Sequence, residues 1–179
     1  PAFYAGAGKT FVGRPAGWLG WPLVATSHTW ENGKNQQSHQ DTTFCEALLG
    51  EMADGVRVLF PADYNSTLAL LPAIYRSRGQ LACLVVPKRE RPCLFDAGQA
   101  VRLAEDGAVL VAEQGDGELL LIACGSYQLS EMLRAGARLA QAGHGYRLVY
   151  LQEPGRFRAA RDALEGTALA SDELRERLF

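Results

Sequence analysis

The sequence predicts a soluble α/β protein made of two small three-layer units with mainly parallel sheets. Short apolar runs typical of buried strands alternate with amphipathic segments at spacings of about 10 to 15 residues. A charged break at 87–92 separates two rounds of this alternation and is the best candidate for a linker. The length of 179 residues, with 47% apolar and 21% charged residues, suits one α/β domain or two small packed ones.

The overall charge and the lengths of the apolar runs exclude several function classes. Eighteen Lys and Arg oppose 20 Asp and Glu, so the net charge of −2 gives no basic field for a nucleic-acid backbone. No apolar run approaches the roughly 18 residues that span a bilayer, and the first residues lack a secretory pattern. We therefore expect a cytoplasmic protein with neither nucleic acid nor membrane as a partner.

The first unit is predicted to hold three strands and two helices. The strands are 23–27, 56–60 and 81–86, the last being nearly all apolar as a strand covered on both faces must be. The first helix is predicted from the capping box Thr43-x-x-Glu46 to Gly55. Its core-facing residues are expected to be Phe44, Leu48, Leu49 and Met52.

The second helix of this unit is expected to run to about Arg76, with Asn65 or Ser66 as its cap. Pro72 should kink this helix or shift its start, because proline lacks the amide hydrogen that the helix needs. The residues expected to face the core are Leu68, Leu71 and Tyr75.

The second unit repeats the pattern. Strands are predicted at 108–111, 119–124 and 146–151, with a turn at 114–117 between the first two. A helix is predicted from Ser126, as its cap, to about Gln141. A nucleophile elbow at Ser126 is disfavoured because the glycines of that motif are absent. The tail 156–179 is expected to form one or two amphipathic helices.

The cysteines and histidines do not indicate a metal site. The four cysteines, Cys45, Cys83, Cys93 and Cys124, form no CxxC pair, and three lie in apolar segments as expected of buried reduced thiols. The three histidines, His28, His39 and His144, have no ligand partner at a metal-binding spacing. His144 lies between two glycines and is expected to be a solvated loop residue.

The polar segment 27–41 is the strongest functional candidate. It follows the carboxyl end of a predicted parallel strand, which is the edge where open α/β sheets bind ligands. It carries two imidazoles, an ammonium group, several amides and a carboxylate. Its length exceeds the usual connection of about two to six residues, which favours a functional loop over a solvated surface loop.

Part of this segment resembles a known enzyme family. Ser38-His39-Gln40-Asp41, preceded by Asn35, resembles the histidine-bearing loop of the phosphoketolases. These thiamine-diphosphate enzymes, related to transketolases, act on xylulose 5-phosphate or fructose 6-phosphate. The similarity covers roughly 20–155, through these further segments: 56–65, Arg76-Ser77-Arg78, Lys88 and 122–125.

The resemblance implies a domain organisation and a set of partners. Residues 1–88 correspond to the later part of a pyrimidine-binding domain and 89–179 to a transketolase-like C-terminal domain. The N-terminal region that binds thiamine diphosphate and Mg²⁺ is then missing, so neither cofactor is expected on this fragment, which alone should be inactive. Sugar phosphate, inorganic phosphate, the missing N-terminal region and a second copy in a homodimer are the implied partners.

The resemblance also implies roles for individual residues. His39 matches the active-site histidine, whose imidazole is suited to proton transfer near neutral pH. Asn35 matches an asparagine that hydrogen-bonds the sugar phosphate or the hydroxyls, and Lys88 matches a lysine that pairs with the substrate phosphate. Lys34 replaces a family histidine and supplies a further cation, and Arg14 is another candidate for the same phosphate.

Three readings therefore remain open. In the first, the chain is the C-terminal part of a phosphoketolase-like lyase that forms acetyl phosphate and an aldose phosphate. A transketolase-like carboligation or a divergent ketose substrate is a variant of it, since the loop departs from the family at 34, 36, 37 and 42. In the others, the chain is a non-catalytic assembly module, or a module that binds a sugar phosphate without chemistry.

Overall fold

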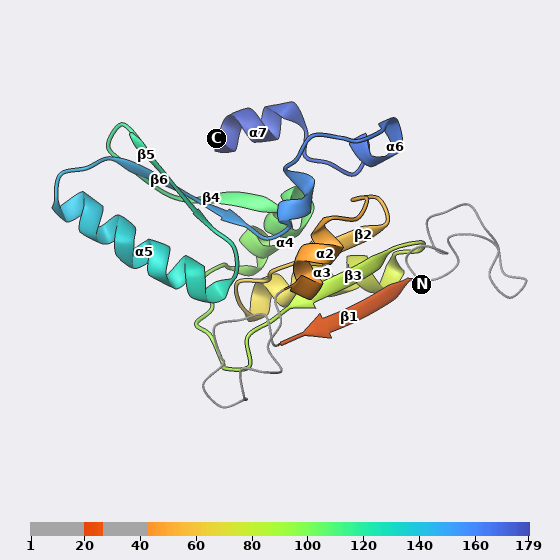
Figure 1. Cartoon of the computed structure of the whole chain (residues 1–179). Helices are drawn as coiled ribbons and strands as arrows, with labels where there is room; N and C mark the ends of the chain where they lie inside the picture. Colours follow the sequence, from red (N-terminus) through yellow and green to blue (C-terminus); the bar gives the residue numbers. More distant parts are fainter. Residues whose placement is uncertain (1–19, 27–42) are drawn as a thin grey trace, which may run out of the picture.

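The computed structural model describes residues 20–26 and 43–179, which form two small sheets with helices packed on them (Figure 1). The elements, in chain order, are β1 Trp21–Ala25, α2 Thr43–Leu49, β2 Val56–Leu59, α3 Tyr64–Arg76, β3 Leu81–Val85, α4 Ala97–Asp106, β4 Ala108–Gln114, β5 Leu119–Ala123, α5 Ser126–Gln141, β6 Tyr146–Leu151, the 3-10 helix η3 Pro154–Arg156, α6 Ala163–Gly166 and α7 Asp172–Leu178.

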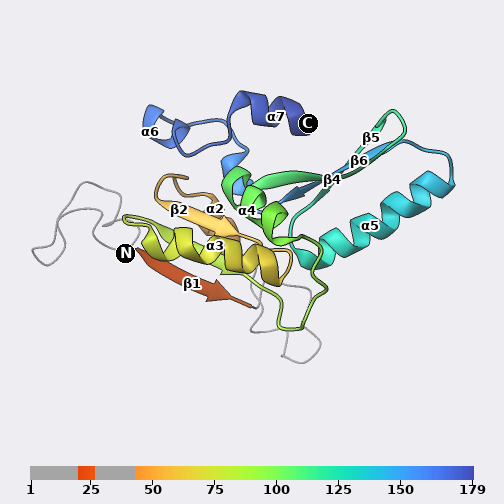
Figure 2. The same ribbon diagram turned by 180° about the vertical axis from the view of Figure 1, so that it is seen from behind.

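The first sheet has the order β1-β3-β2, and both of its strand pairs are parallel, as predicted. Leu70 and Ile74 of α3 pack against Leu84 and neighbouring apolar residues on one face. On the other face, Cys45 of α2 packs against Cys83 and neighbouring side chains. The helices α2 and α3 therefore cover opposite faces of the sheet, as Figures 1 and 2 show from two sides.

The second sheet has the order β4-β6-β5, and its central strand β6 is parallel to β5 but antiparallel to β4. Leu129 of α5 packs on one face, beside Leu148 of β6. Leu174 and Leu178 of α7 pack on the opposite face, beside Val149. Both units thus have helices on two faces of a small sheet, which confirms the predicted α/β class.

Helix α3 differs from the prediction in its cap and in its buried face. Asp63 is the N-cap, and its side chain accepts a hydrogen bond from the backbone amide of Ser66. Pro72 lies inside the helix without ending it. The predicted core residues Leu68 and Tyr75 are exposed, because this helix also carries the apolar residues Leu70 and Ile74 on another face, and these are the buried ones.

Three other expectations need correction. Helix α2 ends at Leu49, well before Gly55, and it buries Cys45 while Phe44 remains exposed. Helix α4 was not predicted, although Asp96 and Gln99 form a capping box at its start. The N-cap of α5 is Gly125 rather than Ser126, since the backbone at Gly125 has a positive φ of 95° and no side chain caps the helix.

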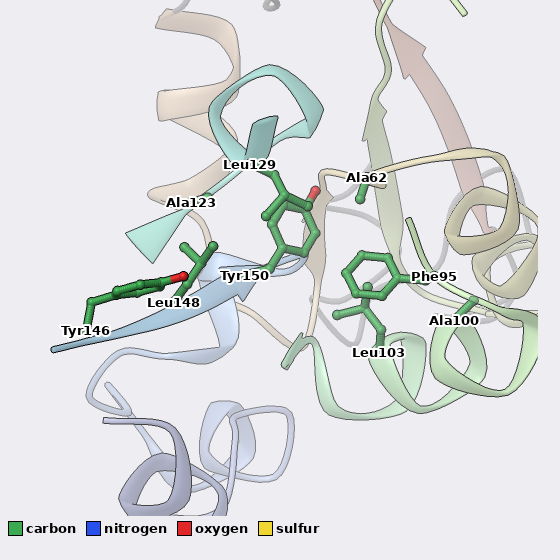
Figure 3. Packing of buried hydrophobic residues seen from close by; sticks show 9 residues of the cluster. All are labelled: Ala62, Phe95, Ala100, Leu103, Ala123, Leu129, Tyr146, Leu148 and Tyr150. Atoms are coloured by element: carbon green, nitrogen blue, oxygen red, sulfur yellow. The ribbon is translucent and has the colours of Figure 1, made fainter. Parts of the chain in front are cut away.

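A shared apolar cluster joins the two sheets (Figure 3). Phe95 and Tyr150 lie with their ring centroids 6.1 Å apart, and Ala62 from the turn after β2 belongs to the same cluster. The hydroxyl of Tyr150 donates a hydrogen bond to the carbonyl of Phe60. Arg57 of β2 makes two hydrogen bonds of 2.7 Å to the carboxylate of Glu153, which is 3% exposed. The predicted boundary at residue 88 between a first and a second domain stays a prediction.

The tail is joined to the end of α2 by a charged network around Glu165, whose side chain is fully buried. Glu165 accepts hydrogen bonds from Arg158, Arg161 and the backbone amide of Ala53. Both arginines also donate to backbone carbonyls within 49–51. The Arg161 guanidinium lowers the pKa of Glu165 well below its ordinary value, so the carboxylate is charged near neutral pH. We call this network the tail latch.

Candidate functional site

The carboxyl edge of the first sheet brings together the ends of its three parallel strands. Ala25 lies opposite Val85 in the ladder, and the amide of Val86 donates to the carbonyl of Ala25 over 3.0 Å. Lys88 follows the end of β3 by three residues and is exposed. The structure therefore places Lys88 at the edge where β1 also ends, which is where open α/β sheets bind ligands.

The other predicted site residues, Arg14, Lys34, Asn35 and His39, lie outside the described residues. Their convergence with Lys88 on one anion stays a prediction. What the structure contributes is the position of the strand that precedes three of them. Because β1 ends beside β3, the chain enters segment 27–42 next to the strand that leads to Lys88.

The turn that carries Lys88 is fixed by contacts on its far side. Arg91 donates a hydrogen bond of 2.6 Å to the hydroxyl of Ser130 on α5. Its guanidinium carbon also lies 4.3 Å from the centre of the Tyr127 ring, within range of a cation–π interaction. The predicted linker is thus anchored to the second unit, and this anchoring restricts where the Lys88 backbone can lie.

Asp63, which follows β2 at the same edge, has a structural role that sequence reasoning missed. One carboxylate oxygen accepts from Ser66, and the other accepts from the backbone amides of Leu94 and Phe95 over 2.6 and 2.9 Å. Burial alone would raise the pKa of Asp63, but these hydrogen bonds from Ser66, Phe95 and Leu94 outweigh it and lower the pKa. Asp63 therefore joins α3 to the chain segment after Lys88. The three-residue spacing from Asp63 to Ser66, typical of a capping box, was the sequence signal that could have identified Asp63 as the cap.

The turn before α5 does not present a nucleophile. Ser126 is 5% exposed, and its hydroxyl has no hydrogen-bond partner among the described residues. Burial raises the pKa of the Cys124 thiol to about 12, so it stays protonated near neutral pH. Cys45 and Cys83 are buried free thiols, while Cys93 is exposed. His144 is exposed, as predicted for a loop residue.

The described residues hold no cluster of metal-ligating side chains. Within 20–26 and 43–179, no group of three or more His, Cys, Asp or Glu side chains could hold a metal ion. In the same ranges, no helix is both long and apolar enough to cross a membrane.

The fold is that of the transketolases. A transketolase from Pichia stipitis, carrying the mutation R525L, superposes with a TM-score of 0.70 at 20% sequence identity over 90% of this chain and 22% of that chain. A second structure of that enzyme, in complex with sedoheptulose 7-phosphate, gives a TM-score of 0.65 at 20% identity over 87% of this chain and 20% of that chain.

The sequence is similar to the phosphoketolases, as the family resemblance predicted. The family model described as D-xylulose 5-phosphate/D-fructose 6-phosphate phosphoketolase matches residues 7–77. A probable phosphoketolase of Lactococcus lactis is 28% identical over 88% of this chain and 20% of its own length. Another, from Streptomyces avermitilis, is 33% identical over 65% of this chain and 15% of its own length. The chain thus spans about a fifth or less of these relatives.

Proposed function

We propose that this chain is the C-terminal part of a phosphoketolase-like thiamine-diphosphate enzyme that cleaves xylulose 5-phosphate or fructose 6-phosphate. The observation that carries the proposal is the match of the phosphoketolase family model to 7–77, a range that includes Arg14, Asn35 and His39. Lys88 at the carboxyl edge of the first sheet supports it from the structure. The products would be acetyl phosphate and an aldose phosphate.

Each candidate residue has a role that its chemistry suits. The Lys88 ammonium pairs with the substrate phosphate, and Lys34 and Arg14 add positive charge to the same subsite. The Asn35 amide hydrogen-bonds the sugar phosphate. The His39 imidazole, which takes up and releases protons near neutral pH, transfers the protons as the bonds rearrange. Bound thiamine diphosphate, held by the rest of the enzyme, supplies the carbanion chemistry.

The test uses the full reading frame that contains residues 1–179, with thiamine diphosphate and Mg²⁺ added. Acetyl phosphate is measured from xylulose 5-phosphate and fructose 6-phosphate in the presence of inorganic phosphate. His39→Ala should lower kcat by about 10²–10⁴-fold, the usual contribution of a general acid–base residue. Unchanged turnover in this variant would exclude His39 from the reaction.

Lys88→Met tests the phosphate subsite separately, because losing a phosphate contact should raise KM more than it lowers kcat. Arg138→Met, which removes an exposed cation near the end of α5, is the matched control and should leave both constants unchanged. Equal KM values for Lys88→Met and the control would contradict the role of Lys88. Ketol transfer to an aldose without acetyl phosphate would favour the transketolase-like variant instead.

A further inference from the structure

Two cysteines from different elements meet inside the first unit. Cys45 lies on α2 and is 6% exposed, and Cys83 lies on β3 and is fully buried. Both are free thiols, and both belong to the apolar cluster on the face of the first sheet opposite α3 (Figure 2). Among the described cysteines, only these two share an apolar cluster. The fold therefore brings together two thiols that are distant in the sequence.

The two thiols interact directly, and the interaction makes their chemistry different. A side-chain hydrogen bond with Cys83 lowers the pKa of Cys45 below its ordinary value, although burial opposes this effect. The same hydrogen bond, together with burial, raises the pKa of Cys83 well above its ordinary value. Cys45 is therefore the thiol that ionises more readily. Since the thiolate is the reactive form of cysteine, Cys45 is expected to be the attacking group.

Helix α2 gives a small solute a route to these thiols. The helix has seven residues, and Cys45 is the only one of them that is buried. Leu48 and Leu49 are half-buried against the same cluster, and Phe44 is exposed. A short helix with one buried side chain opens locally at a low cost in free energy. Transient opening of α2 therefore exposes Cys45 without unfolding the sheet.

We propose that Cys45 and Cys83 are the site of a reversible oxidation, in which hydrogen peroxide converts the two thiols into one disulfide. The Cys45 thiolate attacks a peroxide oxygen, so that an S–O bond forms, the O–O bond breaks and hydroxide leaves. The Cys83 sulfur then attacks the sulfur of the Cys45 sulfenic acid. The S–S bond forms, the S–O bond breaks, and the hydroxyl group leaves as water with the Cys83 proton.

The atoms and electrons of this reaction balance. The hydroxide from the first step takes up the proton that Cys45 released, so one hydrogen peroxide yields two water molecules. The two sulfur atoms lose the two electrons that the peroxide gains. The first step also prepares the second, because a sulfenic acid is neutral. The hydrogen bond to the Cys45 thiolate, which is the largest cause of the raised pKa of Cys83, is then lost.

The disulfide joins α2 to β3 by a covalent bond. Helix α2 begins only four positions after His39, so the oxidised chain holds the end of segment 27–42 on the first sheet. A covalent link of this kind also restricts the unfolded chain, and we expect the oxidised form to unfold at a higher temperature. This inference concerns a modification and is independent of the proposed activity.

Peptide mapping of the 179-residue chain tests the proposal in a Cys93→Ser background, which removes the exposed thiol that would link separate chains. The native protein is treated with hydrogen peroxide, alkylated in denaturant and digested. We expect one linked pair of peptides that contains Cys45 and Cys83, and an intact chain that is lighter by two hydrogen atoms. Cys124 should be alkylated. Dithiothreitol should restore the original mass.

Two further substitutions in the same background separate the roles of the thiols. Cys83→Ala keeps the cluster apolar and should prevent the disulfide, leaving Cys45 as a sulfenic acid that dimedone traps. Cys124→Ala is the matched control, since it removes another native thiol and should form the disulfide as the parent chain does. Circular dichroism checks that both variants are folded. The mapping of the parent chain needs no substitution in the core.

Three results would overturn the proposal. The first is a native chain that keeps its three thiols at peroxide concentrations that oxidise Cys93 in the unsubstituted protein. The second is a disulfide between Cys45 and Cys124. The third is a disulfide between Cys45 and Cys83 that forms as fast in urea as in native buffer, because the contact between the thiols would then contribute nothing.

Discussion

The two sheets end differently at their carboxyl edges, although both contain a parallel strand pair and flanking helices. At the first sheet, Lys88 follows β3 into an exposed turn. At the second sheet, Ala123 and Tyr150 are fully buried at the ends of β5 and β6, and the Tyr150 hydroxyl contacts the Phe60 carbonyl of the first unit. The second edge is therefore closed by packing, whereas the turn after β3 at the first edge is exposed.

The largest loss in the free energy of unfolding is expected when the ion pair of Glu153, at the closed edge of the second sheet, is removed. Glu153→Ala leaves the mostly buried Arg57 guanidinium without its partner and should destabilise the fold by about 3–5 kcal/mol. Glu113→Ala is the matched control, because it removes a carboxylate that is 52% exposed from the ion pair with Arg147 and should cost at most about 1 kcal/mol. Urea unfolding measures both, and equal losses would contradict the comparison.

A smaller effect is expected from Tyr150→Phe, which keeps the ring and removes only the hydroxyl. The partly buried Phe60 carbonyl loses its donor, so the free energy of unfolding should fall by about 1–3 kcal/mol at neutral pH.

The same variant predicts a pH dependence. Burial raises the pKa of Tyr150 well above its ordinary value of 10. The neutral phenol therefore contributes stability that is fully present below pH 10 and is lost as the pH rises above it. The difference in unfolding free energy between the unsubstituted chain and Tyr150→Phe should shrink above pH 10. A constant difference up to pH 11 would show that Tyr150 titrates normally.

The smallest effect on stability is expected at the open edge. Lys88→Met should change the free energy of unfolding by no more than about 0.5 kcal/mol, because Lys88 is exposed. Thermal or urea unfolding of the isolated chain measures this without any substrate. A loss of several kcal/mol would mean that Lys88 holds the fold together, and its proposed role in binding phosphate would then need another explanation.

The strands could be predicted to within a few residues, because runs such as 81–85 are apolar throughout and bounded by turn residues. The buried face of α3 could not be predicted, because Leu68 and Tyr75 form as good an apolar stripe as the buried Leu70 and Ile74. Only the position of the sheet decides between the two faces. The direction of β4 also depends on its pairing with β6, which lies far along the chain.

Part of the candidate site could be predicted in the same way. Lys88 was identified from a family resemblance, and its place at a sheet edge follows from the parallel order of the strands. The role of Asp63 was missed because two of its partners, the amides of Leu94 and Phe95, are about 30 residues away and carry no sequence signal. The glycine cap of α5 was missed because serine is the commoner cap.

Through the tail latch, the segment after β6 contributes hydrogen bonds to the first unit. Arg158 and Arg161 supply the donors that satisfy the last carbonyls around the end of α2, and Glu165 keeps those two cations in place. A shortened protein that stopped after β6 would leave these backbone oxygens to water and the Ala53 amide without its acceptor. A shortened chain prepared for crystallisation should therefore keep residues 156–166, which hold the end of α2. Helix α2 begins only four positions after His39, so these contacts also bear on the candidate site.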